Sequence, residues 1–263
     1  MNNNSSIGIF DSGLGGLTVL NKIQELMPQE NYIYFGDTAH LPYGSKSNEC
    51  IIEYSKKIAQ FLIAKNVKAI IIACNSAASV AFETIKKLSN IPIFEVITPS
   101  IIESIKLTNT NEICIIGTKT TINSKIYSKK IYKLNPKINT LEIACPLFVP
   151  IIEEGLENTK IAYEVGKLYL EKIADTNIDT IILGCTHYKI IINTLKKILP
   201  SNIKFIASGL PLAQHLYKHC NNKNKNNKGT TKFYVSDNPK KFKKFAVKFL
   251  NNEVINTKCI ELL

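Results

Sequence analysis

The sequence predicts an α/β protein with two pseudo-symmetric lobes, each a mainly parallel sheet flanked by helices, and a cleft between the lobes. Two short aliphatic runs, residues 70–73 and 181–184, are typical of strands that are buried on both faces of a sheet. Each run leads into a cysteine, Cys74 or Cys185, then into small polar residues and a helical pattern. Because parallel strands end at one edge of a sheet, where open α/β folds bind ligands, we expect both thiols beside one cleft. We also expect a helix N-terminus next to each thiol, which favours the thiolate.

The first lobe begins with alternating strand and helix patterns. Strands are expected at residues 6–10, 31–35, 70–73 and 91–96, and apolar residues at helical spacing indicate helices at 17–27 and 51–62. A glycine-rich turn at 11–16 joins the first strand to the first helix, and two interpretations of it stay open. Such a turn can cradle a phosphate, although Asp11 would repel one; the alternative is a tight turn that caps the helix.

The second lobe repeats this design of strand, polar turn and helix. Strands are expected at residues 112–117, 140–145, 181–184 and 203–207, and a polar helix start is expected at 118–124. Glu153 and Glu154 lie in an otherwise apolar segment. They are either carboxylates placed for chemistry or helix-start acids that the helix dipole stabilises.

The tail is predicted to return to the first lobe, which otherwise has few strands. We expect a helix to about residue 220, a solvated Asn/Lys-rich loop at 221–228, a strand at 230–235, a helix near 239–250 and a last strand. The lobes are therefore predicted as residues 1–98 plus 207–263 and residues 99–206.

Composition indicates a cytoplasmic globular protein. With 263 residues and 45% hydrophobic content, the chain is long enough to bury a sizeable core in two lobes. The N-terminal segment does not resemble a signal peptide, and no run approaches the ~18 apolar residues of a membrane helix. The seven cysteines are scattered without paired spacing, which favours reduced thiols over disulfides or a metal site. We therefore expect no bound metal and no membrane partner.

The net charge of +12 raises the possibility of nucleic-acid binding. All 33 basic residues are lysine, however, whereas base recognition relies on the bidentate arginine fork. Only the segments at 221–232 and 240–248 concentrate lysine. We expect a solvated lysine-rich surface and no nucleic-acid partner.

The two strand-end thiols differ from the other cysteines in their neighbours. A buried cysteine is most often a small apolar side chain, and this interpretation suits Cys114 and Cys145. Hydroxyl and amide side chains follow Cys74 and Cys185, and such groups at helix N-termini suit the carboxylates of an anionic ligand. His187 is placed in the chain to take or hold the proton of Cys185.

A series of short motifs lies in order between residues 7 and 190. They are FDSGLGGLT (10–18), YFGDT (34–38), PYG (42–44), ACN (73–75), GT (117–118), TI (121–122), ACPLFVP (144–150), EEG (153–155) and LGCTHY (183–188). Together they resemble the motifs of the glutamate racemase family. The resemblance implies two α/β lobes with the active site between them, and the interconversion of L- and D-glutamate without a cofactor. It also implies a role in supplying D-glutamate for peptidoglycan, and we expect a homodimer.

The resemblance also implies roles for individual residues. Cys74 and Cys185 correspond to the two catalytic acid/bases, with Asp11 and His187 as their respective helpers and Glu153 supporting His187. The implied substrate contacts are Asp11, Ser12, Tyr43, Gly44, Asn75, Ser76, Thr118, Thr121, Thr186 and His187.

Four positions depart from the usual family pattern. Ser76 replaces threonine and keeps the hydroxyl, while Leu41, Lys189 and Ala207 replace cysteine, proline and aspartate. We expect these departures to affect local packing and regulation rather than the chemistry.

Two further functions remain as alternatives. Aspartate racemase shares the two-thiol scheme, but its second motif resembles Cys-Thr-Glu, so His187 favours glutamate. A catalytically silent amino-acid-binding protein would not need both thiols and both helpers, and their presence favours an enzyme.

Overall fold

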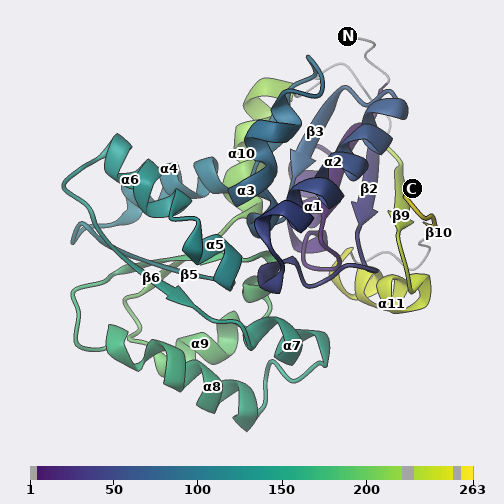
Figure 1. Cartoon of the computed structure of the whole chain (residues 1–263). Helices are drawn as coiled ribbons and strands as arrows, with labels where there is room; N and C mark the ends of the chain where they lie inside the picture. Colours follow the sequence, from purple (N-terminus) through teal and green to yellow (C-terminus); the bar gives the residue numbers. More distant parts are fainter. Residues whose placement is uncertain (1–4, 221–227, 251–255, 263) are drawn as a thin grey trace.

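Two parallel sheets form the two lobes of the computed structural model, which describes residues 5–220, 228–250 and 256–262. The larger sheet consists of β1 (Ile7–Asp11), β2 (Tyr32–Gly36), β3 (Ala69–Ile72), β4 (Ile93–Glu95), β9 (Thr231–Val235) and β10 (Thr257–Cys259). The smaller sheet consists of β5 (Glu112–Gly117), β6 (Asn139–Ala144), β7 (Thr180–Gly184) and β8 (Lys204–Ala207). All strand pairs within these sheets are parallel, and helices flank both sheets (Figure 1). The predicted fold class is confirmed.

The two sheets repeat one strand order. The larger sheet contains the order β2-β1-β3-β4, and the smaller sheet has the equivalent order β6-β5-β7-β8. In the larger sheet the chain passes from β1 to β2 on one side and then to β3 and β4 on the other, so the strand order reverses between β1 and β3. The same reversal occurs between β5 and β7 in the smaller sheet. The crevice at the carboxyl ends of those strands is where open α/β sheets bind ligands. Asp11 ends β1, and Cys74, Thr118 and Cys185 lie just beyond β3, β5 and β7.

Helices of both lobes pack against the sheets and against one another. In chain order they are α1 (Leu17–Leu26), α2 (Asn48–Ala64), α3 (Asn75–Lys86), α4 (Ile97–Leu107), α5 (Lys119–Asn123), α6 (Ile126–Leu134), α7 (Phe148–Glu153), α8 (Lys160–Leu170), α9 (Ile192–Ile198), α10 (Gly209–Cys220) and α11 (Pro239–Leu250). Short 3₁₀ turns are η1 (Tyr43–Ser45), η2 (Glu171–Ile173) and η3 (Thr186–Lys189). None of the described helices is long and apolar enough to span a membrane.

The core is divided by the two faces of the smaller sheet. Strands β1, β3 and β7 are buried along their whole length, as their aliphatic runs predict. Along β5, Ile113 and Ile115 belong to the apolar cluster that also fills the first lobe, whereas Cys114 and Ile116 belong to a second cluster. Successive strand residues point to opposite faces, so one strand contributes to both clusters and ties the lobes together.

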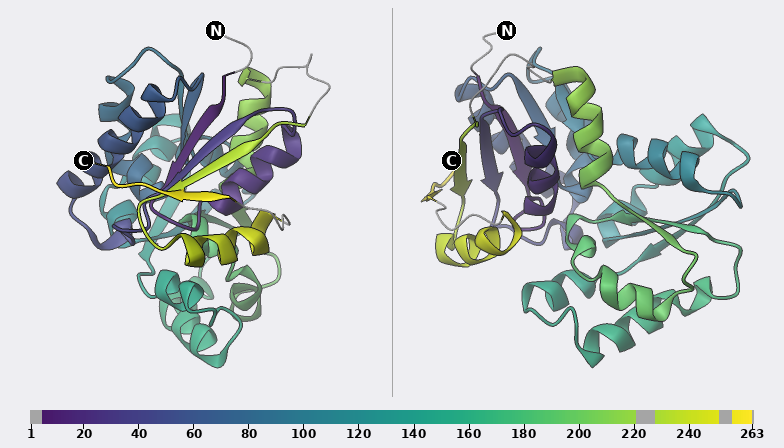
Figure 2. Two further views of the ribbon diagram at one scale, coloured as in Figure 1. Left: turned by 90° about the vertical axis from the view of Figure 1, so that its right-hand side faces the viewer. Right: turned by 180° about the vertical axis from the view of Figure 1, so that it is seen from behind.

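The tail extends the larger sheet. Strand β9 pairs with β2, and β10 pairs with β9, at the outer side of the lobe (Figure 2). Helix α11 lies between these strands in the chain and below the sheet in Figure 1, on the side of α7. The lobe boundaries at residues 98 and 207 stay a prediction. The solvated loop expected at 221–228 falls almost wholly on residues 221–227, which lie outside the described part of the chain.

Candidate active site

Cys74 lies at the junction of β3 and α3, as the sequence predicts. The residue is the N-cap of α3, and its Sγ accepts the N–H of Ala77 at 3.5 Å. The thiol lies 3.6 Å from Oγ of Ser12, to which it donates. Burial, and then the nearby charge of Asp11, raise the pKa of Cys74 to about 12. Burial therefore favours the neutral thiol form of Cys74.

Asp11 lies fully buried at the end of β1, beneath Cys74 and Ser12. Its Oδ2 accepts the N–H of Gly13 at 2.9 Å, and its Oδ1 lies 3.4 Å from Oγ1 of Thr186 in the other lobe. Burial raises the pKa of Asp11 above its ordinary value, although the charge of His187 partly opposes this. The turn at 11–16 thus directs an N–H onto its own aspartate, which supports the tight-turn interpretation over a phosphate cradle.

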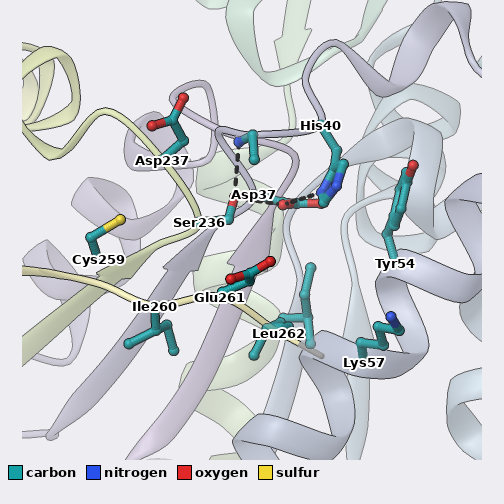
Figure 3. Close-up of a pocket in the computed structure, with 12 residues that line it drawn as sticks. Asp37, His40, Tyr54, Lys57, Ser236, Asp237, Cys259, Ile260, Glu261 and Leu262 are labelled. Atoms are coloured by element: carbon teal, nitrogen blue, oxygen red, sulfur yellow. Dashed lines mark hydrogen bonds and ion pairs between the residues drawn. The ribbon is translucent and has the colours of Figure 1, made fainter.

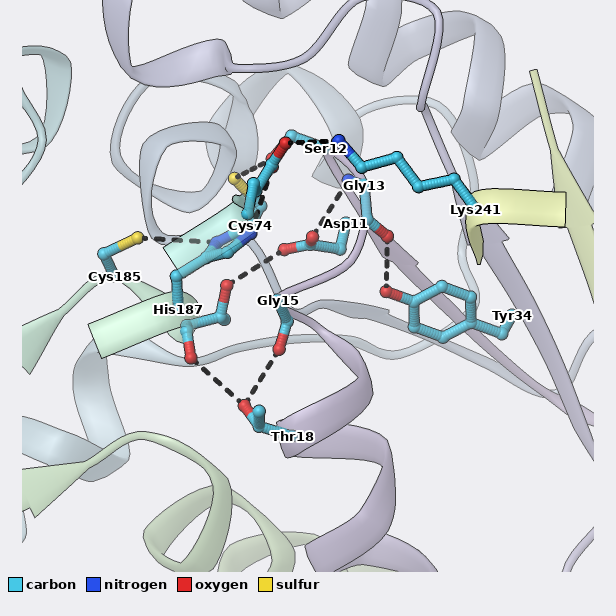
Figure 4. A network of polar contacts seen from close by, with 12 residues as sticks. Asp11, Ser12, Gly13, Gly15, Thr18, Tyr34, Cys74, Cys185, His187 and Lys241 are labelled. Carbon is cyan, nitrogen blue, oxygen red and sulfur yellow. Dashed lines mark hydrogen bonds and ion pairs between the residues drawn. The ribbon is translucent and has the colours of Figure 1, made fainter. Parts of the chain in front are cut away.

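Cys185 follows β7, but the helix expected next to it is only the short 3₁₀ turn η3. Its sulfur caps no backbone N–H there, so the prediction of a helix N-terminus is right for Cys74 and wrong for Cys185. The nearest polar partner is His187, whose Nδ1 lies 3.9 Å from Sγ of Cys185 (Figure 4). The 3₁₀ turn begins directly after Cys185, and His187 is its second residue. The imidazole therefore lies close enough to contact the sulfur.

His187 lies between Cys185 and Glu153. Its Nε2 is 3.3 Å from Oε1 of Glu153, an ion-pair contact without hydrogen-bond geometry. Burial alone would lower the pKa of His187, but the sulfur of Cys185 and the carboxylate of Glu153 raise it to about 10. His187 is therefore placed to hold a proton beside Cys185.

Glu153 is the last residue of α7 and Glu154 caps it, so the helix-start interpretation of these acids is wrong. A carboxylate at a helix C-terminus faces the unfavourable end of the dipole. Burial also acts to raise the pKa of Glu153, but His187 and Lys241 together lower it below its ordinary value. The geometry supports the interpretation of Glu153 as a carboxylate placed for chemistry.

Hydroxyl and amide groups of both lobes meet opposite the thiols. Ser76 Oγ lies 2.8 Å from Oγ1 of Thr118 and 3.4 Å from Oγ1 of Thr121, which joins α3 to α5. Tyr127 donates its hydroxyl to Oδ1 of Asn75 at 2.6 Å. The Nδ2 of Asn75 is buried and has no hydrogen-bond partner within the described residues, so it is available to a ligand.

A small cavity of about 20 Å³ lies between the two thiols, little more than one water molecule needs. It is lined by Ser12, Gly13, Leu41, Pro42, Tyr43, Gly44, Cys74, Asn75, Ser76, Thr118, Val149, Glu153, Cys185, Thr186 and His187. Among the predicted site residues that the structure describes, Asp11 and Thr121 lie behind this lining. A space of this size does not hold an amino acid.

Two glycines permit this close contact between lobes. A Cβ on Gly15 would lie 2.2 Å from Oγ1 of Thr186, and a Cβ on Gly44 would lie 2.4 Å from Cβ of Thr118. Contacts this short do not occur, so any side chain there would force the lobes apart.

Comparisons with known proteins place the chain among racemases. The profile of the Asp/Glu/Hydantoin racemase family matches residues 7–216. A glutamate racemase from Persephonella marina is 42% identical over 91% of this chain and 91% of its own length. The chain belongs to the glutamate racemase family.

Solved structures of family members share the whole fold. The Francisella tularensis glutamate racemase, crystallised in complex with D-glutamate, superimposes with a TM-score of 0.91 at 39% identity, covering 99% of this chain and 98% of that one. A Bacillus anthracis isoform gives a TM-score of 0.94 at 32% identity, with 99% of each chain covered.

The departures from the family pattern lie around the site. Leu41 lines the small cavity and packs against Gly13. Lys189 and Ala207 both line a separate cavity of about 280 Å³ that reaches Cys185 from the opposite side. These placements agree with the expectation of effects on packing and regulation, which stays a prediction.

A larger cavity of about 450 Å³ lies on the outer side of Asp37, against the tail strand β10 (Figure 3). His40 stacks on Tyr54 there and lies 2.8 Å from Asp37. Asp37 also accepts the hydroxyl of Tyr43, a residue of the small cavity, at 2.6 Å. Neither Cys74 nor Cys185 is among the described residues that line this larger space, so its size alone does not make it the active site.

Sequence reasoning missed two residues that contact the site. The sequence around Tyr127 shows only the spacing of a buried helix position, and nothing near it in the chain indicates its hydrogen bond to Asn75. Lys241 belongs to the lysine-rich tail helix, yet its Nζ lies 3.4 Å from Oε2 of Glu153. Only the folded arrangement of distant segments reveals either contact. No group of three His, Cys, Asp or Glu side chains in the described ranges is placed to hold a metal ion.

Proposed function

We propose that this protein interconverts L- and D-glutamate by a two-base mechanism in which Cys74 and Cys185 exchange protons with opposite faces of the α-carbon. One observation carries the proposal: two buried thiols at equivalent strand ends of two equivalent sheets line one small cavity. Inversion requires that a proton leave one face and that another arrive at the opposite face. Two opposed bases do this without turning the substrate over.

The helpers differ on the two walls. A free thiol is largely protonated near neutral pH, and burial makes ionisation harder still. We infer that Asp11, whose charge acts on Cys74, and His187, beside Cys185, take the thiol protons, and that Glu153 orients His187. By this proposal Cys74 with Asp11 removes the α-proton of D-glutamate, and Cys185 with His187 removes that of L-glutamate.

The substrate carboxylates and ammonium group have polar partners on both lobes. Asn75 and Ser76 begin α3, whose first N–H groups lack intrahelical acceptors and favour an anion. Thr118 and Thr121 face them from the other lobe, and the remaining proposed contacts are Ser12, Tyr43, Gly44 and Thr186. Closure of the lobes excludes water and fixes the reacting distance.

The proposal extends to the biological role. We propose that the enzyme needs no cofactor, works as a homodimer in the cytoplasm, and supplies D-glutamate for peptidoglycan synthesis. The family membership and the two-thiol site support the reaction; the assembly and the pathway follow from the resemblance alone.

The test is a time course of purified protein with L-glutamate, read by a chiral assay in deuterated water. Racemisation should proceed with exchange of the α-hydrogen, with chelator present and no added cofactor. Loss of activity on chelation that a metal restores would overturn the cofactor-free scheme. L-aspartate in parallel tests the aspartate alternative, which predicts the faster reaction with aspartate.

Separate half-reactions test the two walls. A glutamate that bears chloride on its β-carbon loses its α-proton to one thiolate, after which the C–Cl electron pair leaves with chloride and an unsaturated amino acid remains. Cys74→Ser should retain this elimination from the L form only, and Cys185→Ser from the D form only, each lost step falling by about 10²- to 10⁴-fold. Cys50→Ser, a change at an exposed thiol, is the control. Equal losses for both enantiomers would contradict the assignment of opposed walls.

A further inference from the structure

We propose that Lys241 is a positioning residue for the Cys185 wall: from the opposite lobe, it holds the Glu153 carboxylate against His187. This inference rests on the proposed two-thiol function and adds a residue of the tail helix to it.

The contacts form a chain from the tail helix to the thiol. Nζ of Lys241 lies 3.4 Å from Oε2 of Glu153, whose other oxygen, Oε1, lies 3.3 Å from Nε2 of His187. The Nδ1 of the same imidazole lies 3.9 Å from Sγ of Cys185. Each carboxylate oxygen therefore has its own cationic partner, which fixes the plane of the carboxylate (Figure 4 shows Lys241 reaching toward the thiol site).

Glu153 needs a permanent positive charge beside it. Its side chain is only 9% exposed and lies at the C-terminal end of α7, where the helix dipole disfavours an anion. His187 alone cannot supply the compensation throughout the reaction, because its own charge changes when it exchanges a proton with Cys185. Lys241 takes no part in that proton exchange, so it can pair with Glu153 in both states of His187, and its charge contributes to the lowered pKa of Glu153.

The contact also joins the two lobes. Helix α11 follows β9 of the larger sheet, whereas Glu153 belongs to the lobe of the smaller sheet. In the arrangement that this structure shows, the carboxylate has one partner from each lobe. We therefore expect closure of the lobes to complete the orientation of His187.

The same helix provides a matched control. Lys248, two turns after Lys241 on α11, pairs at 3.2 Å with Glu157 in the connection between α7 and α8, and so makes a second ion pair between the two lobes. Glu157 is not among the groups that shift the pKa of His187. Lys248→Gln thus removes an equivalent interlobe pair and leaves the support of His187 intact.

The experiment measures chloride elimination from the L and D forms of the β-chloro substrate by Lys241→Gln, Lys241→Arg and Lys248→Gln. Because the side chain of Lys241 is partly exposed, we expect Lys241→Gln to slow elimination from the L form about two- to five-fold, with the D form unchanged. Lys241→Arg should restore most of the rate, and Lys248→Gln should leave the ratio of the L to D rates at the wild-type value.

The salt dependence of the rates provides a second test. Added salt screens a partly exposed ion pair, so the L-to-D rate ratio of the wild type should fall with salt while that of Lys241→Gln stays constant. Equal slowing of both enantiomers in Lys241→Gln, or a salt-independent ratio in the wild type, would overturn the inference. If Cys74→Ser and Cys185→Ser show no difference between the L and D substrates in the same assay, the proposed function fails. That outcome is distinguishable from failure of the inference about Lys241 alone.

Discussion

Replacement of Asp11 by asparagine separates two roles that the structure allows for this carboxylate. Asparagine keeps an oxygen to accept the N–H of Gly13 and a polar group to face Thr186, so the local geometry should survive. What disappears is the negative charge and the ability to accept a proton. Since burial raises the pKa of Asp11, the charged form is disfavoured by folding. The variant should therefore unfold at the same or a higher temperature near neutral pH, which serves as the check on folding.

The two roles predict opposite signs for the activity of Cys74. With its pKa raised to about 12, about one Cys74 thiol in 10⁴ is ionised at pH 8, which corresponds to about 5 kcal/mol of the cost of activation. If Asp11 accepts that proton within the site, Asp11→Asn should slow proton removal from D-glutamate by about 10²- to 10⁴-fold. If Asp11 acted only through its charge, which raises the pKa of Cys74, the variant would ionise Cys74 more readily and react faster.

The assay must avoid the constraint that the equilibrium ratio of enantiomers imposes on kcat/KM in the two directions. Chloride elimination from the D form of the β-chloro substrate reports the Cys74 step alone, and the L form reports the Cys185 step. We expect Asp11→Asn to lose the D reaction and retain most of the L reaction, while ultraviolet titration of the Cys74 thiolate moves to lower pH. A faster D reaction in this variant would refute the role of Asp11 as proton acceptor.

Two further predictions test closure and ligand placement. Gly44→Ala puts a Cβ 2.4 Å from Cβ of Thr118. Overpacking that costs about 1–3 kcal/mol predicts a loss of about 5- to 100-fold in kcat/KM. Unchanged steady-state kinetics would show that the lobes need not close this far. Tyr127→Phe removes the hydroxyl that donates to the buried Oδ1 of Asn75 at 2.6 Å. Urea unfolding should therefore show a free energy of unfolding lower by about 1–3 kcal/mol, and the KM for glutamate should rise. A free energy of unfolding equal to that of the wild type would contradict this prediction.

The fold was predictable because its central strands are marked by their own local sequence. Buried parallel strands need continuous aliphatic runs, and β3 and β7 each end in a cysteine that the sequence places at the carboxyl edge. Helices α4, α6 and α8 were not predicted, although their apolar residues have helical spacing.

The predictions that failed at the site concern where helices begin and end, which tertiary packing decides here. A cysteine followed by small polar residues precedes a long helix at Cys74 but a 3₁₀ turn at Cys185, and both local sequences are compatible with either outcome. The sequence left open whether Glu153 starts a helix or is a carboxylate placed for chemistry, and α7 is short and ends there. The contact from Lys241 spans 88 positions in the chain, and the sequence of α11 shows only a lysine-rich amphipathic helix.

The repeated strand order gives two equivalent positions, but the groups beside the two thiols differ. By the proposed two-base mechanism, one sulfur is a thiolate and the other is a thiol at any moment. In this structure Cys74 lies beside a carboxyl group in a fully buried setting, which favours the neutral thiol. Cys185 lies beside His187, which holds a proton up to about pH 10 and is itself supported by Glu153 and Lys241. The 3₁₀ turn that replaced the expected helix is what places the imidazole there, so the break in symmetry between the lobes gives the two thiols different titratable neighbours.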